Sequence, residues 1–414
     1  MTVDDVDFKS LYRKSLYEVT TADRWTLTVT RYRPVAQTFQ QPIFGEPILL
    51  VHGFSQNRHA WTSGQFVKNL LFFGADIHIV ELRGHGKSSI ELQHQKQAEG
   101  ARLPDDIDYA WDIDSYFLYD IPAAVEGVRK VTRREKIFYI GHSMGGMLGY
   151  GYAGIHDDLE GIITIGAPSQ LGKGFLMLRL VALLEPALGR VVDTALLAMT
   201  LQRLGTWAAG RGAGASLRAL RLATLADRHL PARVAPGALR YKYVPMDDFL
   251  RILEKLLTPE NFASYERLAP FFTILTNPAR VTNEDVRWLL REGGEREPRA
   301  VIAEFARWAR SGQMVCYRTG YDFQRNFSKI QIPMAIIFGD LDPLASVEST
   351  SSIYRAAKSE YLLWRPVKGN SHIELTMGHD IRQIAYDVKN LVEYAATHRG
   401  RKPSLPRVGR TLLR

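Results

Sequence analysis

The sequence predicts an α/β protein in which a mostly parallel sheet is flanked by helices and interrupted by a large helical insertion. Short, fully apolar runs recur along the chain, and helical stretches separate the first four of them, which predicts the sheet. The alternation stops after Pro168 and the apolar runs resume only at Met334. A gap of this length is too long for a loop, so it predicts a structured insertion.

The expected strands begin with a hairpin. Residues 17–20 and 25–32 are typical of two strands around a polar turn at 21–24. The apolar runs that follow indicate strands buried on both faces of a parallel sheet. They lie at residues 47–51, 76–80, 137–140, 162–165, 334–338 and 361–364. The predicted helices of this region lie at residues 61–73, 116–132, 144–155 and 381–397.

The insertion is predicted as a helical cap of residues 168–325. It divides the core into residues 1–167 and 326–398, and a basic tail, 399–414, follows. Local signals predict helices within the cap, at 247–257, after a capping box that begins at Thr282, and at 300–311 with an end at Gly312.

The most apolar part of the cap is residues 171–209. Charged residues interrupt it, so it contains no uncharged run of the roughly 18 residues that a membrane span needs. Interfacial or substrate-facing helices fit this segment, and so does ordinary burial of apolar helix faces.

Charge is unevenly distributed along the chain, whose net charge is +9. Residues 173–240 hold ten basic and three acidic residues, and residues 399–414 hold six basic residues and no acid. These segments suggest peripheral contact with an anionic membrane, or solvated helix faces and a disordered tail. We expect no nucleic-acid partner. The single cysteine, Cys316, excludes an intrachain disulfide, and the acidic start at 1–7 lacks a signal-peptide pattern, so we expect a cytoplasmic location.

A candidate nucleophile is Ser143, in the run Gly141-His142-Ser143-Met144-Gly145. This run directly follows an expected strand and directly precedes an expected helix. A serine on such a turn is held in strained backbone geometry with its hydroxyl exposed. Gly141 and Gly145 are then needed because side chains there would clash with the neighbouring strand and helix.

A serine hydroxyl needs a base, and the base needs an orienting acid, in the chain order Ser, Asp or Glu, His. Asp340 and Asp342 both follow the strand at 334–338. Asp342 is favoured because it reaches farther from the strand end, whereas Asp340 could cap the turn. His372, after the last strand, is favoured as base over His379, which lies at the start of the last helix.

Acyl transfer also needs donors for the oxyanion. His52-Gly53-Phe54 follows the strand at 47–51, so the Phe54 amide is one candidate donor and the Met144 amide the other. Gly53 would allow close approach of the backbone, and a simple strand-ending turn is the alternative interpretation. Two further histidines receive no catalytic role, because His142 would point away from the turn and His85 is interpreted as a loop residue.

These motifs resemble serine esterases and lipases of the α/β-hydrolase superfamily. The resemblance is carried by the runs Val51-His52-Gly53-Phe54, Glu81-Leu82-Arg83-Gly84-His85-Gly86-Lys87-Ser88 and 141–146. Further runs are similar to parts of acid lipases, at 18–27, 111–114 with 119–123, and 305–308. Residues 15–167 and 300–395 are covered, whereas 173–240 have no counterpart, and Glu374 stands near the place where acid lipases usually have an aspartate after the histidine.

The resemblance implies an α/β-hydrolase fold in which Ser143, Asp342 and His372 form a triad and Phe54 and Met144 supply the oxyanion hole. The expected reaction is hydrolysis of lipophilic carboxylic esters through an acyl-enzyme, with no metal and no cofactor. An acyltransferase with the same triad and a non-catalytic binding protein are the alternatives. The serine at 143 disfavours dehalogenase and epoxide hydrolase chemistry, since both would need an acid there.

Overall fold

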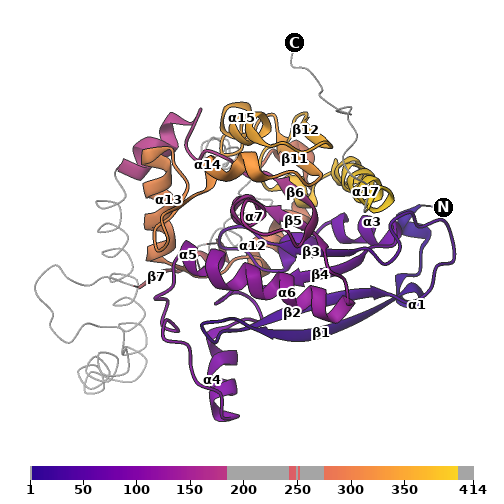
Figure 1. Ribbon diagram of the computed structural model, residues 1–414, viewed down its shortest axis with the longest axis horizontal. Helices are drawn as coiled ribbons and strands as arrows, with labels where there is room; N and C mark the ends of the chain where they lie inside the picture. Colours follow the sequence, from indigo (N-terminus) through magenta and orange to yellow (C-terminus); the bar gives the residue numbers. More distant parts are fainter. Residues whose placement is uncertain (1, 184–241, 249, 252–274, 400–414) are drawn as a thin grey trace, which may run out of the picture.

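The computed structural model describes residues 2–183, 242–248, 250–251 and 275–399 (Figure 1). Eight strands form one sheet in the order β1-β2-β4-β3-β5-β6-β11-β12. Their bounds are β1 Tyr12–Thr20, β2 Thr26–Pro34, β3 Pro47–Val51, β4 Asp76–Val80, β5 Ile137–His142, β6 Leu159–Ile165, β11 Met334–Gly339 and β12 Leu362–Val367. The pairs β1–β2 and β2–β4 are antiparallel, and every other neighbouring pair in this sheet is parallel. The predicted mostly parallel sheet is therefore confirmed.

Two layers of helices cover the sheet. Alternate residues of β3 point to opposite faces: Ile48 and Leu50 belong to one hydrophobic core and Leu49 and Val51 to the other. Both faces are therefore buried, which is why these strands are apolar throughout. Helices α6 (Ile121–Thr132), α7 (Met144–Ala153) and α15 (Val347–Ala356) contribute to the second core, and α2 (His59–Thr62), α3 (Phe66–Phe72) and α17 (Ile381–His398) contribute to the first. Figure 1 shows α6 and α7 in front of the central strands and α3 with α17 at the right.

Shorter elements complete the described chain. Further α-helices are α1 Phe8–Leu11, α4 Ile90–Ala98, α5 Ile113–Ser115, α12 Asn283–Glu292, α13 Arg299–Ser311, α14 Phe323–Asn326 and α16 Glu374–Met377. Two small ladders pair β7 (Tyr243–Val244) with β8 (Glu297–Pro298) and β9 (Val315–Cys316) with β10 (Tyr321–Asp322).

Two predicted helices differ from the observed ones. The helix expected at 61–73 is divided into α2 and α3 around Gly64, whose backbone lies against α16 so closely that a Cβ would come within 2.6 Å of the Met377 Cα. The helix expected at 116–132 begins instead as a π-helical turn, Tyr116–Asp120. Pro122 follows in the first turn of α6, where the missing amide hydrogen interrupts the regular bonding.

The described part of the cap agrees with its predicted helix signals. The Thr282 hydroxyl accepts the Asp285 amide at 3.1 Å and caps α12, which ends before Gly293. Helix α13 ends at Gly312, which has φ +67°. In Figure 1 α13 and β7 lie at the side of the molecule away from α3 and α17.

Other predictions concern residues outside this description. They concern the apolar segment 171–209, the helix at 247–257, the basic segment 173–240 and the tail 399–414. Most residues of each segment lie outside the described ranges. The domain boundaries and the membrane contact therefore stay predictions. None of the helices in the described ranges has the length and apolar character needed to cross a bilayer.

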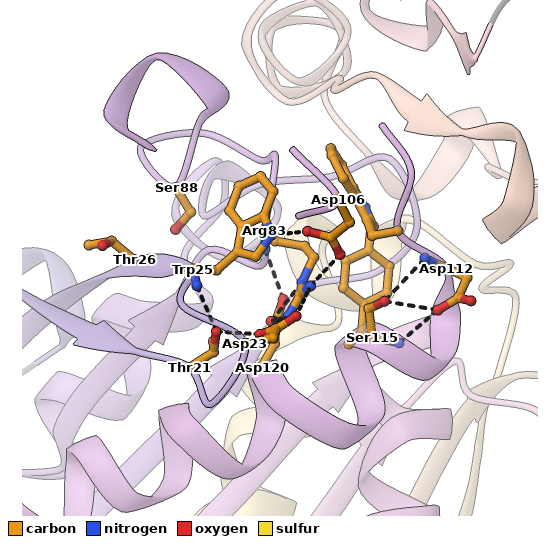
Figure 2. Close-up of polar contacts among 12 residues, drawn as sticks. Thr21, Asp23, Trp25, Thr26, Arg83, Ser88, Asp106, Asp112, Ser115 and Asp120 are labelled. Atoms are coloured by element: carbon orange, nitrogen blue, oxygen red, sulfur yellow. Dashed lines mark hydrogen bonds and ion pairs between the residues drawn. The ribbon is translucent and has the colours of Figure 1, made fainter. Parts of the chain in front are cut away.

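The turn after β4 is held by a buried arginine (Figure 2). The Arg83 guanidinium donates to Asp120 Oδ1 from Nε at 2.9 Å and from Nη2 at 2.7 Å. Its Nη1 donates to Asp23 at 2.6 Å and to Asp106 at 2.8 Å. The Arg83 side chain thus connects the β1–β2 turn and the loop that contains Asp106 to the π-helical turn before α6. These bonds fix the position of the turn after β4, which leads toward the candidate site.

Candidate active site

Ser143 lies between β5 and α7 in a strained conformation, with φ +50° and ψ −118°. The flanking glycines make this turn possible. A Cβ on Gly141 would lie 2.4 Å from the Gly145 carbonyl carbon, and one on Gly145 would lie 2.4 Å from the Val51 oxygen. The steric reason predicted for both glycines therefore agrees with the structure. Strain of this kind is retained where the surroundings over-determine it, and it is common at functional sites.

The structure brings three of the predicted side chains into one chain of contacts. His372 Nε2 lies 2.9 Å from Ser143 Oγ, and His372 Nδ1 lies 2.7 Å from Asp342 Oδ2. Asp342 follows β11 and His372 follows β12, so both loops leave the same edge of the sheet as Ser143. The other Asp342 oxygen accepts the amides of Leu344 at 2.8 Å and Ala345 at 3.1 Å, which orients the carboxylate.

The rival acid and base lie elsewhere. Asp340 is exposed, and its carboxylate accepts the Gly369 amide at 2.6 Å. His379 is exposed just before α17, and its amide donates to the Arg280 oxygen. Within the described ranges neither side chain contacts Ser143. The structure thus brings Asp342 and His372, rather than Asp340 and His379, together with Ser143.

His372 has a defined protonation pattern. Its Nδ1 faces a carboxylate and donates a proton, which leaves Nε2 to accept the Ser143 hydroxyl. Burial by itself would lower the pKa of His372. The Asp342 carboxylate outweighs burial and raises the pKa above its ordinary value of 6.5. A base with this orientation can remove the proton from Ser143.

The loop that carries His372 is anchored to residues 275–277. The amides of His372 and Ile373 donate to the Leu275 oxygen at 3.2 and 2.9 Å. Glu374 accepts the amides of Ser371 and, at 2.9 Å, of Asn277. Glu374, which departs from the acid-lipase pattern, therefore serves to hold this loop in place.

His142 is the last residue of β5 and directly precedes Ser143. Its Nδ1 lies 3.0 Å from Gln56 Oε1 and its Nε2 lies 3.3 Å from the His372 oxygen, so neither nitrogen contacts the Ser143 hydroxyl. Burial, together with nearby His372, lowers the pKa of His142 to about 3. His142 therefore stays neutral, and its orientation agrees with the expectation that it points away from the nucleophile.

The two predicted oxyanion donors flank Ser143. Met144 begins α7, so its amide belongs to the first turn and has no partner within the helix. A Cβ on Gly53 would lie 3.0 Å from the Ser143 Cβ, which places the Gly53–Phe54 peptide beside the nucleophile. In the described part of the chain neither the Phe54 nor the Met144 amide has a hydrogen-bond partner, so both are free for a ligand.

His52 holds the Gly53–Phe54 peptide. Its Nε2 accepts the Leu82 amide at 3.1 Å, so Nδ1 carries the proton and donates to the Gly53 oxygen at 2.9 Å. The peptide unit is planar and trans, so fixing the Gly53 oxygen also fixes the direction of the Phe54 amide. Burial keeps the pKa of His52 far below its usual range, and the ring stays neutral.

An apolar cavity of about 400 Å³ opens beside Ser143. Helix α13 supplies much of its wall, and Phe54 packs edge-on against Phe305 of that helix with ring centres 5.5 Å apart. Among the described lining residues, only Ser143 and Arg299 are polar. The lining comprises Phe54, Ser143, Met147, Pro168, Leu171, Leu178, Val181, Ala182, Val244, Arg299, Ile302, Phe305, Ala306, Ala309 and Leu344.

A buried pair beside this site, His85 and Glu297, was not predicted from the sequence. His85 lies in a turn as expected, but it is fully buried and its Nε2 lies 3.1 Å from Glu297 Oε1. Glu297 comes from the cap and is fully buried. The Arg-Gly-His-Gly run was visible in the sequence, whereas no local pattern connected it with a glutamate more than two hundred residues later.

This chain belongs to the alpha/beta hydrolase fold family, whose family model matches residues 46–373. The fold class predicted from the strand and helix pattern is thereby confirmed. A solved structure of DcsB with its substrate analogue covers 92% of this chain and 100% of that chain, with a TM-score of 0.51 and 11% identity. At this identity the likeness concerns the fold alone.

Among curated proteins, the chain is similar to lipases. Human gastric triacylglycerol lipase is 27% identical over 148 residues, which cover 34% of this chain and 34% of the lipase. The tear acid lipase-like protein of Mesocricetus auratus is 25% identical over 141 residues, 34% of each chain. The chain thus matches about a third of the length of these relatives, and the expected partial resemblance to acid lipases is confirmed.

Proposed function

We propose that this protein is a serine hydrolase that cleaves carboxylic esters, with Ser143 as nucleophile, His372 as base and Asp342 as orienting acid. The observation that carries the proposal is the continuous contact from Asp342 through His372 to a strained serine at the wall of an apolar cavity. Similarity to lipases supports the same reaction class.

The mechanism follows from these contacts. His372 Nε2 takes the Ser143 proton as Oγ attacks the ester carbonyl carbon, and the Phe54 and Met144 amides stabilise the oxyanion. When the tetrahedral intermediate collapses, the carbon–oxygen bond to the alcohol breaks and His372 gives its proton to that oxygen. A water molecule, deprotonated by His372, then attacks the acyl-enzyme and releases the acid and free Ser143.

The cavity favours a lipophilic acyl group. Apart from Ser143 and Arg299, its described walls are built from Leu, Ile, Val, Ala, Met, Pro and Phe side chains. Each buried methylene contributes about 0.8 kcal/mol of binding, so lengthening the acyl chain increases binding until the cavity is full.

A serine-directed fluorophosphonate probe tests the nucleophile. We expect the wild-type protein to be labelled at Ser143 and to hydrolyse p-nitrophenyl esters, and Ser143→Ala to lose both properties. Absence of labelling and hydrolysis in the wild type would refute the enzyme and favour a binding protein. Product analysis with added alcohols separates the remaining alternative, because an acyltransferase forms a new ester rather than free acid.

The cavity is tested by filling it from α13. Ala306 lines the cavity, whereas Ala300 is exposed on the same helix. We expect Ala306→Phe to lower kcat/KM for a decanoyl ester at least tenfold relative to an acetyl ester, and Ala300→Phe to leave this ratio unchanged. An unchanged ratio in both variants would show that the acyl group binds elsewhere.

A further inference from the structure

Ser55 lies directly after the candidate oxyanion donor Phe54. Its φ of +56° falls in a region of backbone conformation that residues other than glycine rarely adopt. All of its polar groups bind the segment 295–297, which precedes α13. The Ser55 amide donates to Glu297 Oε1 at 2.5 Å and the hydroxyl donates to the Glu295 oxygen at 2.6 Å. The Ser55 oxygen accepts the Glu295 amide at 3.0 Å. This segment therefore over-determines the conformation of Ser55.

The far end of the same loop is held in the same way. Asn57 donates to the Glu295 oxygen Oε1 at 2.6 Å and to the Glu292 carbonyl at 2.9 Å. Glu295 Oε1 also accepts the Gly86 amide at 3.0 Å. We call residues 53–57 the oxyanion loop. This loop is thus tied to the cap at Ser55 and at Asn57.

The Glu297 carboxylate is itself rigidly placed. Oε1 contacts His85 Nε2 at 3.1 Å, and Oε2 accepts the Tyr116 hydroxyl at 3.2 Å, which in turn accepts Trp111 Nε1–H at 2.8 Å. His85 Nδ1 lies 2.8 Å from the Arg83 oxygen, so both ring nitrogens face acceptors. Burial by itself would lower the pKa of His85, but the Glu297 carboxylate outweighs burial and raises this pKa to about 9. His85 therefore carries both protons, and its positive charge balances the negative charge of Glu297 in a fully buried pair.

We propose that Glu297 is a positioning residue for the oxyanion hole: it holds the Ser55 amide and thereby fixes the peptide units that aim the Phe54 amide at the reacting carbonyl. This inference rests on the proposed ester hydrolysis. His52 fixes the loop from the core side through Gly53, and Glu297 fixes it from the cap side through Ser55. The position of the Phe54 amide beside Ser143 is thus fixed from both the core and the cap.

The size of the effect follows from what an oxyanion donor contributes. Loss of one such donor lowers kcat by about 10²–10³-fold. Glu297 acts one residue away, so its loss displaces the Phe54 amide without removing it. Because the donor acts on charge that develops in the transition state, the loss falls on kcat rather than on KM.

The experiment compares Glu297→Gln with Glu304→Gln. Both residues are buried on the cap side and each accepts a core amide: Ser55 for Glu297, and Ile113 at 2.6 Å for Glu304. In Glu297→Gln the new side chain keeps the size of the old one, but an amide NH2 replaces one of the two oxygens at which the Ser55 amide, His85 Nε2 and the Tyr116 hydroxyl point, and His85 loses its counter-charge. We expect kcat to fall about 10–100-fold with KM within about threefold, and the Ki of an alkylboronic acid to rise by a similar factor. Glu304→Gln should keep both constants.

Three results overturn the inference while the wild type remains active: Glu297→Gln with unchanged kcat, equal losses in both variants, or a rise confined to KM. A wild type that neither hydrolyses esters nor reacts with fluorophosphonate overturns the proposed function together with this inference. If Glu297→Gln does not fold, Glu297→Asp decides. Its carboxylate keeps the charge that faces His85 but is one methylene shorter, which withdraws it from the Ser55 amide, so kcat should fall while KM stays within about threefold; an unchanged kcat contradicts the inference.

Discussion

The Nδ1 atom of His372 lies 2.7 Å from Oδ2 of Asp342, and both side chains are buried. This contact fixes which nitrogen carries the proton. Asp342→Asn would offer an amide in place of the carboxylate and favour the opposite tautomer of His372. We expect kcat to fall by about 10⁴-fold with little change in circular dichroism.

Asp340→Asn is the matched control for this substitution. Asp340 is exposed and accepts only the Gly369 amide among its described neighbours. We expect its kcat to stay within about threefold of wild type. A large loss in Asp340→Asn together with a small loss in Asp342→Asn would show that the acid is wrongly assigned.

The pH dependence follows from the same pair. His372 acts as base only when neutral, and Asp342 raises its pKa above 6.5 although burial opposes this. Activity should therefore fall as the pH drops, with the midpoint of kcat/KM above 6.5. In Asp342→Asn only the smaller effect of Glu374 still opposes burial, so the midpoint should move below 6.5. A p-nitrophenyl ester assay at constant ionic strength measures both, and a wild-type midpoint below 6.5 contradicts this interpretation of His372.

The strain at Ser143 predicts a trade between activity and stability. Glycine adopts φ +50° without steric cost, whereas alanine retains the strain. We expect Ser143→Gly to have a free energy of unfolding about 1–2 kcal/mol higher than Ser143→Ala. Urea unfolding of the two inactive variants measures the difference, and equal stabilities would mean that the turn is not strained.

The buried cluster around Arg83 predicts a large stability effect far from the nucleophile (Figure 2). Arg83→Met would leave Asp120, which is fully buried, without its two charged bonds. We expect the free energy of unfolding to fall by about 3–5 kcal/mol. Arg24→Met is the control, because its partner Asp105 is largely exposed, and it should change stability by less than about 1 kcal/mol. Similar small effects in both would show that the cluster is not stabilising.

The sequence predicted the elements in which one physical signal dominates. Strands β3 and β4 have the predicted bounds because both are buried on two faces and end at polar or glycine residues. Helix α15 was not predicted, because Ser349, Thr350, Ser351 and Ser352 give its centre a low helix preference. Packing against β12 stabilises this helix, and the contacts include a hydrogen bond from Trp364 Nε1 to the Thr350 hydroxyl at 3.1 Å.

The site was predictable to the extent that its parts lie next to strand ends. Ser143, Asp342 and His372 each follow a strand whose position the apolar pattern indicated, so their meeting at one sheet edge could be expected. Glu297 could not be expected, since it acts across the fold on Ser55, 242 residues away in sequence. Its environment depends on how the cap packs on the core, and no local pattern encodes that.

The order of the strands has a consequence for synthesis. Strand β6 ends at Ile165, but its neighbour β11 begins only at Met334, so 168 residues must emerge between them. At about 5–20 residues per second, the edge of β6 waits roughly 10–30 seconds for its partner. The apolar Ile162, Ile163 and Ile165 are on that edge. While the chain is still on the ribosome, this edge is the place where a chaperone would be most useful and where aggregation of nascent chains would begin.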